Sequence, residues 1–152
     1  MKITELLSRE SILIPMTATD KESVMEAMAE SLAAAGHVVD KNAYMEALIA
    51  REKTGSTGIG FGVAIPHGKS AGVATAGLAF AKLAQPVDWN SLDGAPVQAA
   101  FMIAVPEAAA GNDHLKILIA ISRKLIDDEF RSSLFRVKNA EELLALLETV
   151  EG

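Results

Sequence analysis

The chain has 152 residues, of which 50% are hydrophobic and 22% are charged, so it can bury the core that one domain needs. Fourteen basic against twenty acidic residues give a net charge of −6 without any lysine- or arginine-rich run, which argues against a nucleic-acid surface. The lack of cysteine excludes thiol chemistry, and no segment has the pattern of a signal peptide or a membrane span. We therefore expect a soluble cytoplasmic protein.

Two helices are expected in the first third of the chain. Thr19 and Glu22 have the spacing of a capping box, so the first helix is predicted to begin after Thr19. Gly36 ends that helix, and Asp40 caps a second one. The second helix stops before residues 54–62, "TGSTGIGFG", because such closely spaced glycines disfavour helical structure.

The middle of the chain predicts a buried sheet. Three apolar runs with β-branched or aromatic members have the pattern of strands, at residues 63–65, 75–83 and 97–105. Because these runs are apolar on both faces, we expect helices to cover the sheet on both sides.

Three helical segments close the chain, at residues 113–126, 128–135 and 139–150. The first of them is apolar nearly all round and is expected to be largely buried. Together these elements predict an α/β sandwich, and the absence of linkers and repeats predicts a single domain over residues 1–152.

His67 is the first candidate for chemistry, since it lies between a proline and a glycine in "FGVAIPHGKS". Pro66 restricts its own backbone and holds Ile65 extended, while Gly68 allows another backbone or a ligand to approach closely. His67 is thus predicted to end a strand on a stiff mount with open space beside it, an arrangement that suits a reactive group. The alternative is a histidine that only hydrogen-bonds a neighbouring carbonyl.

His114 is the second candidate. Asn112 or Asp113 has the character of an N-cap, which places His114 in the first turn of a helix. The positive end of that helix disfavours protonation and attracts anions, so we expect a pKa below the usual ~6.5 and a neutral ring that donates to a phosphate. The alternative is that His114 serves as a further capping residue.

Arg51 is the third candidate, because it precedes the glycine-rich loop. Its guanidinium offers a fork for phosphoryl oxygens, or it simply stabilises the C-terminus of its own helix. His37 follows Gly36 and is read as an exposed loop residue.

Other kinds of site are not supported by the sequence. The glycine-rich loop follows a helix and lacks the ending of a P-loop, and the scattered histidines do not have metal-ligand spacing. There is no turn of the type that carries the nucleophile of a serine hydrolase. Neither a cofactor nor a metal is therefore expected.

Three stretches carry a resemblance to a known family: "REKTGSTGIGFGVAIPHGKS", "PVDWNSLDGAPVQAAFMIAVPE" and "NDHLKIL". They resemble the enzyme IIA domain of the fructose/mannitol class of the bacterial phosphoenolpyruvate-dependent sugar phosphotransferase system, nearly end to end. "PVDWNSLDG" and "AVPE" are more similar to fructose-type members than to the nitrogen-regulatory branch.

The resemblance implies a phosphocarrier with a mixed sheet between helices. In that family the histidine matching His67 takes a phosphoryl group from phosphorylated HPr and passes it to a cysteine of enzyme IIB, which serves the membrane protein enzyme IIC. His114 matches the family's second active-site histidine, and Arg51 its arginine before the glycine loop. The chain lacks cysteine, so the IIB acceptor is expected to be another polypeptide.

Three functions remain open at this stage. The first is a phosphotransferase subunit for sugar uptake, working through a phosphohistidine. The second is a regulatory phosphocarrier of the nitrogen-regulatory type, and the third is a non-catalytic anion-binding domain. Glycine amides of residues 55–62 would support the transferring group, and Phe61 and Ile59 are candidates for an apolar docking patch around His67.

Overall fold

The computed structural model describes residues 3–108 and 113–150. Two short 3-10 helices, Ile3–Leu6 and Arg9–Ser11, open the described chain. The strands are β1 (Ile12–Met16), β2 (Gly58–Gly60), β3 (Val63–Ala64), β4 (His67–Ser70), β5 (Gly77–Val87) and β6 (Val97–Pro106). The α-helices are α1 (Lys21–Ala34), α2 (Lys41–Lys53), α3 (Asp113–Leu125), α4 (Asp128–Arg136) and α5 (Ala140–Leu147).

The six strands form one mixed sheet in the order β1-β5-β6-β3-β2, with β4 also paired to β6. The β5–β6 and β2–β3 pairs are antiparallel, whereas β1–β5, β3–β6 and β4–β6 are parallel. The register between β3 and β6 equals that between β4 and β6, since 99 − 63 = 36 and 103 − 67 = 36. Strands β3 and β4 are therefore two parts of one extended run along β6, interrupted where Pro66 has no N–H to donate.

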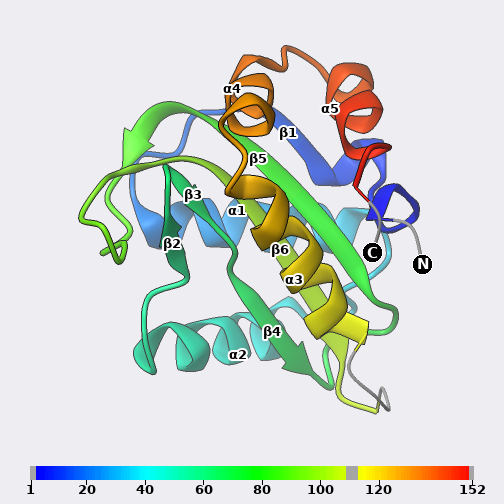
Figure 1. Cartoon of the computed structure of the whole chain (residues 1–152). Helices are drawn as coiled ribbons and strands as arrows, with labels where there is room; N and C mark the ends of the chain where they lie inside the picture. Colours follow the sequence, from blue (N-terminus) through cyan, green and yellow to red (C-terminus); the bar gives the residue numbers. More distant parts are fainter. Residues whose placement is uncertain (1–2, 109–112, 151–152) are drawn as a thin grey trace.

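Helices cover both faces of this sheet, as Figure 1 shows with α3 in front of the strands and α1 behind them. On the α2 face, which α1 and α2 cover, the core includes Val24, Met28, Leu32, Tyr44 and Leu48. On the α3 face, which α3, α4 and α5 cover, it includes Ile117, Ile121, Leu125, Phe130 and Leu143. The predicted α/β sandwich, with a central mixed sheet flanked by helices, is thus confirmed.

Two local predictions about the helices are wrong. The N-cap of α1 is Asp20 rather than Thr19, because the Asp20 carboxylate accepts from the Ser23 backbone N–H at 2.8 Å. Helix α3 is not largely buried: Leu115 and Ile119 are 41% and 48% exposed, one turn apart on its outer side. The apolar residues of α3 therefore serve both the core and an outward surface.

The strand predictions were correct for the long runs and incomplete for the short ones. Strands β5 and β6 lie where apolar runs predicted them, and β3 covers most of the predicted 63–65 segment. Strands β1, β2 and β4 were missed. The Gly36 and Asp40 predictions are confirmed: Gly36 takes a positive φ of 88° just after α1, and Asp40 caps α2.

Candidate functional site

His67 opens β4 and lies half-buried beside Ile103 of β6. Its Nδ1 lies 2.9 Å from the backbone oxygen of Ile65. A carbonyl oxygen can only accept, so Nδ1 carries the hydrogen and donates. In the neutral ring Nε2 then holds the free lone pair, which makes Nε2 the nucleophilic nitrogen of this histidine.

The backbone around His67 is held from two sides. The Ile103 N–H donates to the Pro66 carbonyl at 3.0 Å, which continues the pairing with β6 across the interruption. On the α2 face Gly68 lies so close to α2 that a Cβ there would come within 3.3 Å of both Ala47 and Tyr44. The predicted stiff mount is present, but the prediction that His67 ends a strand is wrong, because His67 begins one.

Tyr44 lies beneath this mount. It is buried, and its hydroxyl donates to the Ile103 carbonyl at 2.9 Å. Burial raises the pKa of Tyr44 far above its ordinary value, so the hydroxyl keeps its proton and remains a donor. Helix α2 is thereby fixed to the strand that pairs with His67.

The side chain of His67 belongs to the α3 face. Neighbours in register on parallel strands share a face, and the partner Ile103 belongs to the core beneath α3. Gly68 and its partner Ala104 belong to the opposite, α2 face. Among the described residues β4 pairs with β6 alone, so its other edge is not covered by a strand.

Arg51 lies in the last turn of α2 and turns back onto the residues that follow. Its Nη1 donates to the Gly55 carbonyl at 2.8 Å and to Thr54 Oγ1 at 3.1 Å. These bonds are what the helix-terminus interpretation predicts, and they also hold the guanidinium in one place. Within the described part of the chain, Arg51 forms no ion pair with a carboxylate.

The loop that holds Arg51 runs along the same edge as His67. The Ile65 N–H donates to the Thr57 carbonyl at 2.9 Å, which extends the antiparallel pairing of β2 and β3 by one step. Antiparallel strands run in opposite directions, so the residues that precede Thr57 lie alongside the residues that follow Ile65, which are Pro66 and His67. Gly55, whose carbonyl binds Arg51, therefore lies toward the His67 end of this pairing.

His114 lies in the first turn of α3, as predicted, because that helix begins at Asp113. The backbone of His114 is thus on the layer that covers the face carrying His67. The side chain of His114 and the predicted cap Asn112 lie outside the described residues, so their roles stay predictions.

The match to a family comes from almost the whole chain. The family model described as "Phosphoenolpyruvate-dependent sugar phosphotransferase system, EIIA 2" covers residues 5–150. The chain belongs to this family.

Several EIIA relatives show how far the likeness extends. The fructose-specific EIIABC component of Bacillus subtilis is 40% identical over 147 residues, which are 97% of this chain and 23% of that protein. A nitrogen regulatory protein of Bradyrhizobium diazoefficiens is 38% identical over 149 residues, 97% of this chain and 95% of that one. The nitrogen regulatory protein IIA-Ntr of Neisseria meningitidis has the same fold, with a TM-score of 0.83 and 38% identity over 95% of this chain and 98% of that one.

His37 of the EIIA chain has a different environment from that of His67. His37 is half-buried rather than exposed, and its Nδ1 lies 2.9 Å from Thr75 Oγ1. Its ring packs over Gly77, where a Cβ would come within 2.5 Å of it. Gly77 pairs with Ala104 of the α2 face, so His37 and His67 lie on opposite faces of the sheet.

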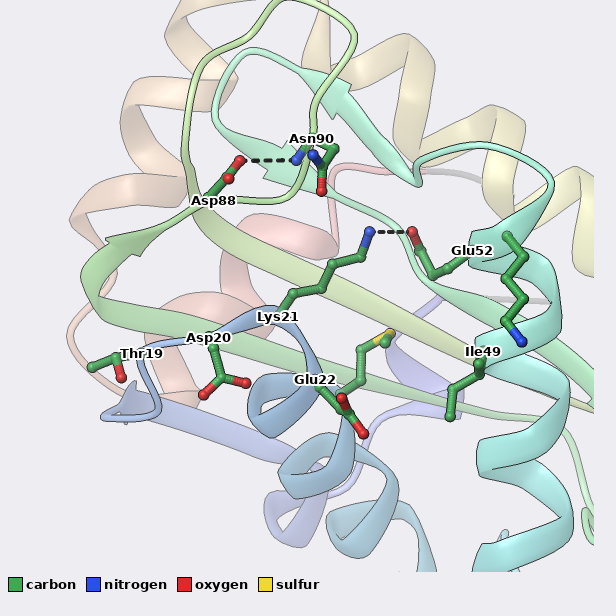
Figure 2. A pocket seen from close by; sticks show the side chains of 10 residues that line it. Thr19, Asp20, Lys21, Glu22, Ile49, Glu52, Asp88 and Asn90 are labelled. Atoms are coloured by element: carbon green, nitrogen blue, oxygen red, sulfur yellow. Dashed lines mark hydrogen bonds and ion pairs between the residues drawn. The ribbon is translucent and has the colours of Figure 1, made fainter.

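One group of polar residues was missed by sequence reasoning. Lys21 and Glu52 form an ion pair of 2.7 Å, and both residues line a pocket of about 610 Å³ between the start of α1 and the end of α2. Figure 2 shows their side chains pointing toward one another, with Asp88 and Asn90 above them in the view. Neither His67 nor Arg51 lines this pocket. The sequence signal that could have indicated this group is Trp89 in "PVDWNSLDG", a large aromatic residue whose carbonyl lies 3.5 Å from Lys21 Nζ.

The docking patch around His67 stays a prediction, although part of its apolar surface is exposed. Phe61 is 49% exposed with a positive φ of 61°, and the Arg131 guanidinium stacks on its ring at 4.4 Å. Ile59 is only partly exposed and packs against the core. The outer residues of α3, Leu115 and Ile119, add apolar surface on the face that carries His67.

Membrane-spanning helices and clustered metal ligands are both absent from the described residues. No helix in them has the length and the apolar character needed to cross a membrane. No group of three or more His, Cys, Asp or Glu in the same part of the chain is arranged to hold a metal ion.

Proposed function

We propose that this EIIA chain is a phosphocarrier in which His67 accepts a phosphoryl group from phosphorylated HPr and passes it to a cysteine of a separate EIIB partner. The observation that carries this proposal is the 2.9 Å hydrogen bond from His67 Nδ1 to the Ile65 carbonyl. It fixes the tautomer in which Nε2 is the nucleophile, without any proton having to move first.

Transfer to His67 needs one bond to form and one to break. The Nε2 lone pair attacks phosphorus, the bond from phosphorus to the donor atom breaks, and its electron pair stays with the donor. In the second transfer a cysteine thiolate of EIIB attacks phosphorus, and the electron pair of the P–Nε2 bond returns to His67. The phosphoramidate is a high-energy link, so the group is able to move onward.

Arg51 and His114 are proposed to stabilise the transferring group. The Arg51 guanidinium supplies positive charge and planar hydrogen bonding for phosphoryl oxygens, from a position that Thr54 and Gly55 already define. A neutral His114 near the N-terminus of α3 would donate one further hydrogen bond.

The glycine amides are a weaker source of donors than the sequence predicted. The Gly55 N–H already donates to the Glu52 carbonyl, and the Gly58 N–H donates to Ser56 Oγ. Internal bonds that stabilise the loop therefore occupy both of these amides.

The specific role that we propose is in fructose-type sugar uptake. In this role the chain acts in the cytoplasm, and residues 1–152 form one EIIA domain. The 40% identity to a fructose-specific component and the "PVDWNSLDG" and "AVPE" motifs support it. The second candidate is a regulatory phosphocarrier, which the 38% identity to nitrogen regulatory proteins over nearly their full length supports.

Reconstitution with phosphoenolpyruvate, enzyme I and HPr tests the shared step. Intact mass should show one added phosphoryl group, and ¹⁵N-edited ³¹P NMR should assign it to Nε2 of His67. A protein that gains no phosphoryl group contradicts the phosphocarrier proposal and favours an anion-binding domain. Offering the phosphoprotein to a fructose-type EIIB from the same cell then separates the uptake role from the regulatory one.

A further inference from the structure

The carboxylate of Glu52 is the centre of a nearly buried polar cluster next to Arg51. The Glu52 side chain is only 9% exposed, and its Oε2 pairs with Lys21 Nζ at 2.7 Å. The same carboxylate accepts from the Thr57 N–H at 3.3 Å and from the Thr57 hydroxyl. One side chain of α2 therefore binds both donors of Thr57, which lies within the glycine-rich loop.

Trp89 joins the cluster from a distant part of the chain. Its indole N–H donates to Thr57 Oγ1 at 3.0 Å, and its carbonyl accepts from Ser56 Oγ at 2.5 Å. Lys21 Nζ lies 3.5 Å from the same carbonyl and 5.7 Å from the centre of the indole ring. The "PVDWNSLDG" motif thus contributes a buried bridge between α1 and the loop.

The cluster also determines where the negative charge of Glu52 lies. Glu52 is the neighbour of Arg51 in sequence, yet its carboxylate is turned to Lys21 and Thr57, as Figure 2 shows for the Lys21 pair. A carboxylate that is already neutralised by Lys21 does not compete with an incoming phosphoryl group for the Arg51 guanidinium.

We propose that Glu52 is a positioning residue for phosphoryl transfer: together with Lys21, Thr57 and Trp89 it fixes the 54–57 turn on which the Arg51 guanidinium is anchored. This inference rests on the proposed function. The turn is short, so a change at Thr57 is transmitted directly to Gly55 and Thr54, which bind Arg51. Glu52 acts through Arg51 and need not touch the phosphoryl group.

Glu52→Ala removes the centre of the cluster and should slow phosphorylation of His67 by about ten- to a hundredfold, the cost of a misplaced transition-state contact. Glu52→Gln should recover most of that loss. Its amide oxygen keeps the bonds to the Thr57 N–H and Lys21, and its NH₂ donates to the Thr57 hydroxyl, which has a second lone pair. Glu46→Ala is the matched control, since Glu46 is an exposed glutamate of the same helix.

A double-mutant cycle separates positioning from general stability. With Arg51→Ala already present, adding Glu52→Ala should change the rate by less than about twofold, because both changes remove the same contact. An equal slowing in both backgrounds would overturn the proposal, and so would an unchanged rate in Glu52→Ala alone.

A second measurement needs no partner protein. In the unaltered chain, NMR of the Arg51 side chain should show slow rotation of a guanidinium bonded to Gly55 and Thr54. Glu52→Ala should speed that rotation, whereas Glu46→Ala and Glu52→Gln should not. An unchanged Arg51 signal in Glu52→Ala refutes the positioning role, while failure of the unaltered chain to accept a phosphoryl group refutes the proposed function.

Discussion

His67 and His37 have hydrogen bonds of equal length and different consequence. Each places its Nδ1 2.9 Å from an oxygen, but the partner of His67 is the Ile65 carbonyl and that of His37 is the Thr75 hydroxyl. A carbonyl only accepts, whereas a hydroxyl both donates and accepts. The tautomer of His67 is therefore fixed, and that of His37 is not.

The two histidines also lie in different parts of the fold. His37 has its ring over Gly77 on the α2 face, beside a turn that follows α1. His67 opens β4, which pairs with β6 alone among the described strands, and its side chain is on the α3 face. Burial and hydrogen bonding alone do not distinguish the two histidines; the identity of the bonded oxygen does, because only the carbonyl partner of His67 fixes which ring nitrogen carries the hydrogen.

The largest expected effect comes from removing His67, and the matched control is removal of His37. His67→Ala should fold normally and gain no phosphoryl group, because no other nitrogen takes the place of Nε2 at this site. His37→Ala should gain one phosphoryl group, as the unaltered protein does. Intact mass after reconstitution with HPr measures both, and full labelling of His67→Ala would contradict the assignment of the nucleophile.

The next effect concerns the charge that Arg51 is proposed to supply. Arg51→Ala should raise the activation free energy of transfer from HPr by roughly 2–4 kcal/mol, as loss of other preorganised electrostatic contacts does. Lys53→Ala removes an exposed cation from the same turn of α2 and should have little effect. Arg51→Lys should recover only part of the rate because it lacks the planar fork. Equal rates for Arg51→Ala and Lys53→Ala in a quench-flow assay would leave Arg51 as a helix cap alone.

A smaller effect is expected at His114. Loss of one hydrogen bond to a charged group should make His114→Ala about tenfold slower in onward transfer to EIIB. His114→Gln retains an N–H donor and should lie between the alanine variant and the unaltered protein. Rapid-mixing transfer assays with labelled phosphoprotein measure this order, and a glutamine variant slower than the alanine variant would argue against a donor role.

The fold was predictable where a single element carries its own signal. Long apolar runs revealed β5 and β6, and the capping residue Asp40 revealed the start of α2. Strand β4, "HGKS", has no β-branched or aromatic residue, so only its pairing with β6 makes it a strand. The exposed side of α3 was missed because apolar residues on the exposed side of a helix look like core residues in a sequence.

The candidate site was predictable in its residues and not in its geometry. The Pro-His-Gly segment indicated His67, but only the folded backbone shows that Ile65 accepts from Nδ1 and so fixes the tautomer. The bridge from Trp89 to Thr57 joins residues that are 32 positions apart, a contact that no local pattern encodes. Long-range polar contacts of this kind depend on how the layers pack.

The smallest effect tests the mount of His67 itself. Tyr44→Phe removes the hydroxyl that donates to the Ile103 carbonyl, while the ring that packs against Gly68 remains. Leaving a buried carbonyl with one partner fewer should cost about 1–2 kcal/mol of the free energy of unfolding. Thermal denaturation should therefore show a Tm lower by about 2–8 °C for a chain of this size.

The same variant, Tyr44→Phe, also tests whether the Tyr44 hydroxyl affects the tautomer and the reactivity of His67. Backbone bonds still hold Pro66 to Ile103, so His67 should keep its tautomer and the phosphorylation rate should fall by less than about threefold. Imidazole NMR should show small shifts for His67 and none for His37, because Tyr44 contacts the strand of one histidine and not the turn of the other. A tautomer change at His67 in Tyr44→Phe would mean that the hydroxyl, and not the Ile65 carbonyl alone, determines which nitrogen is nucleophilic.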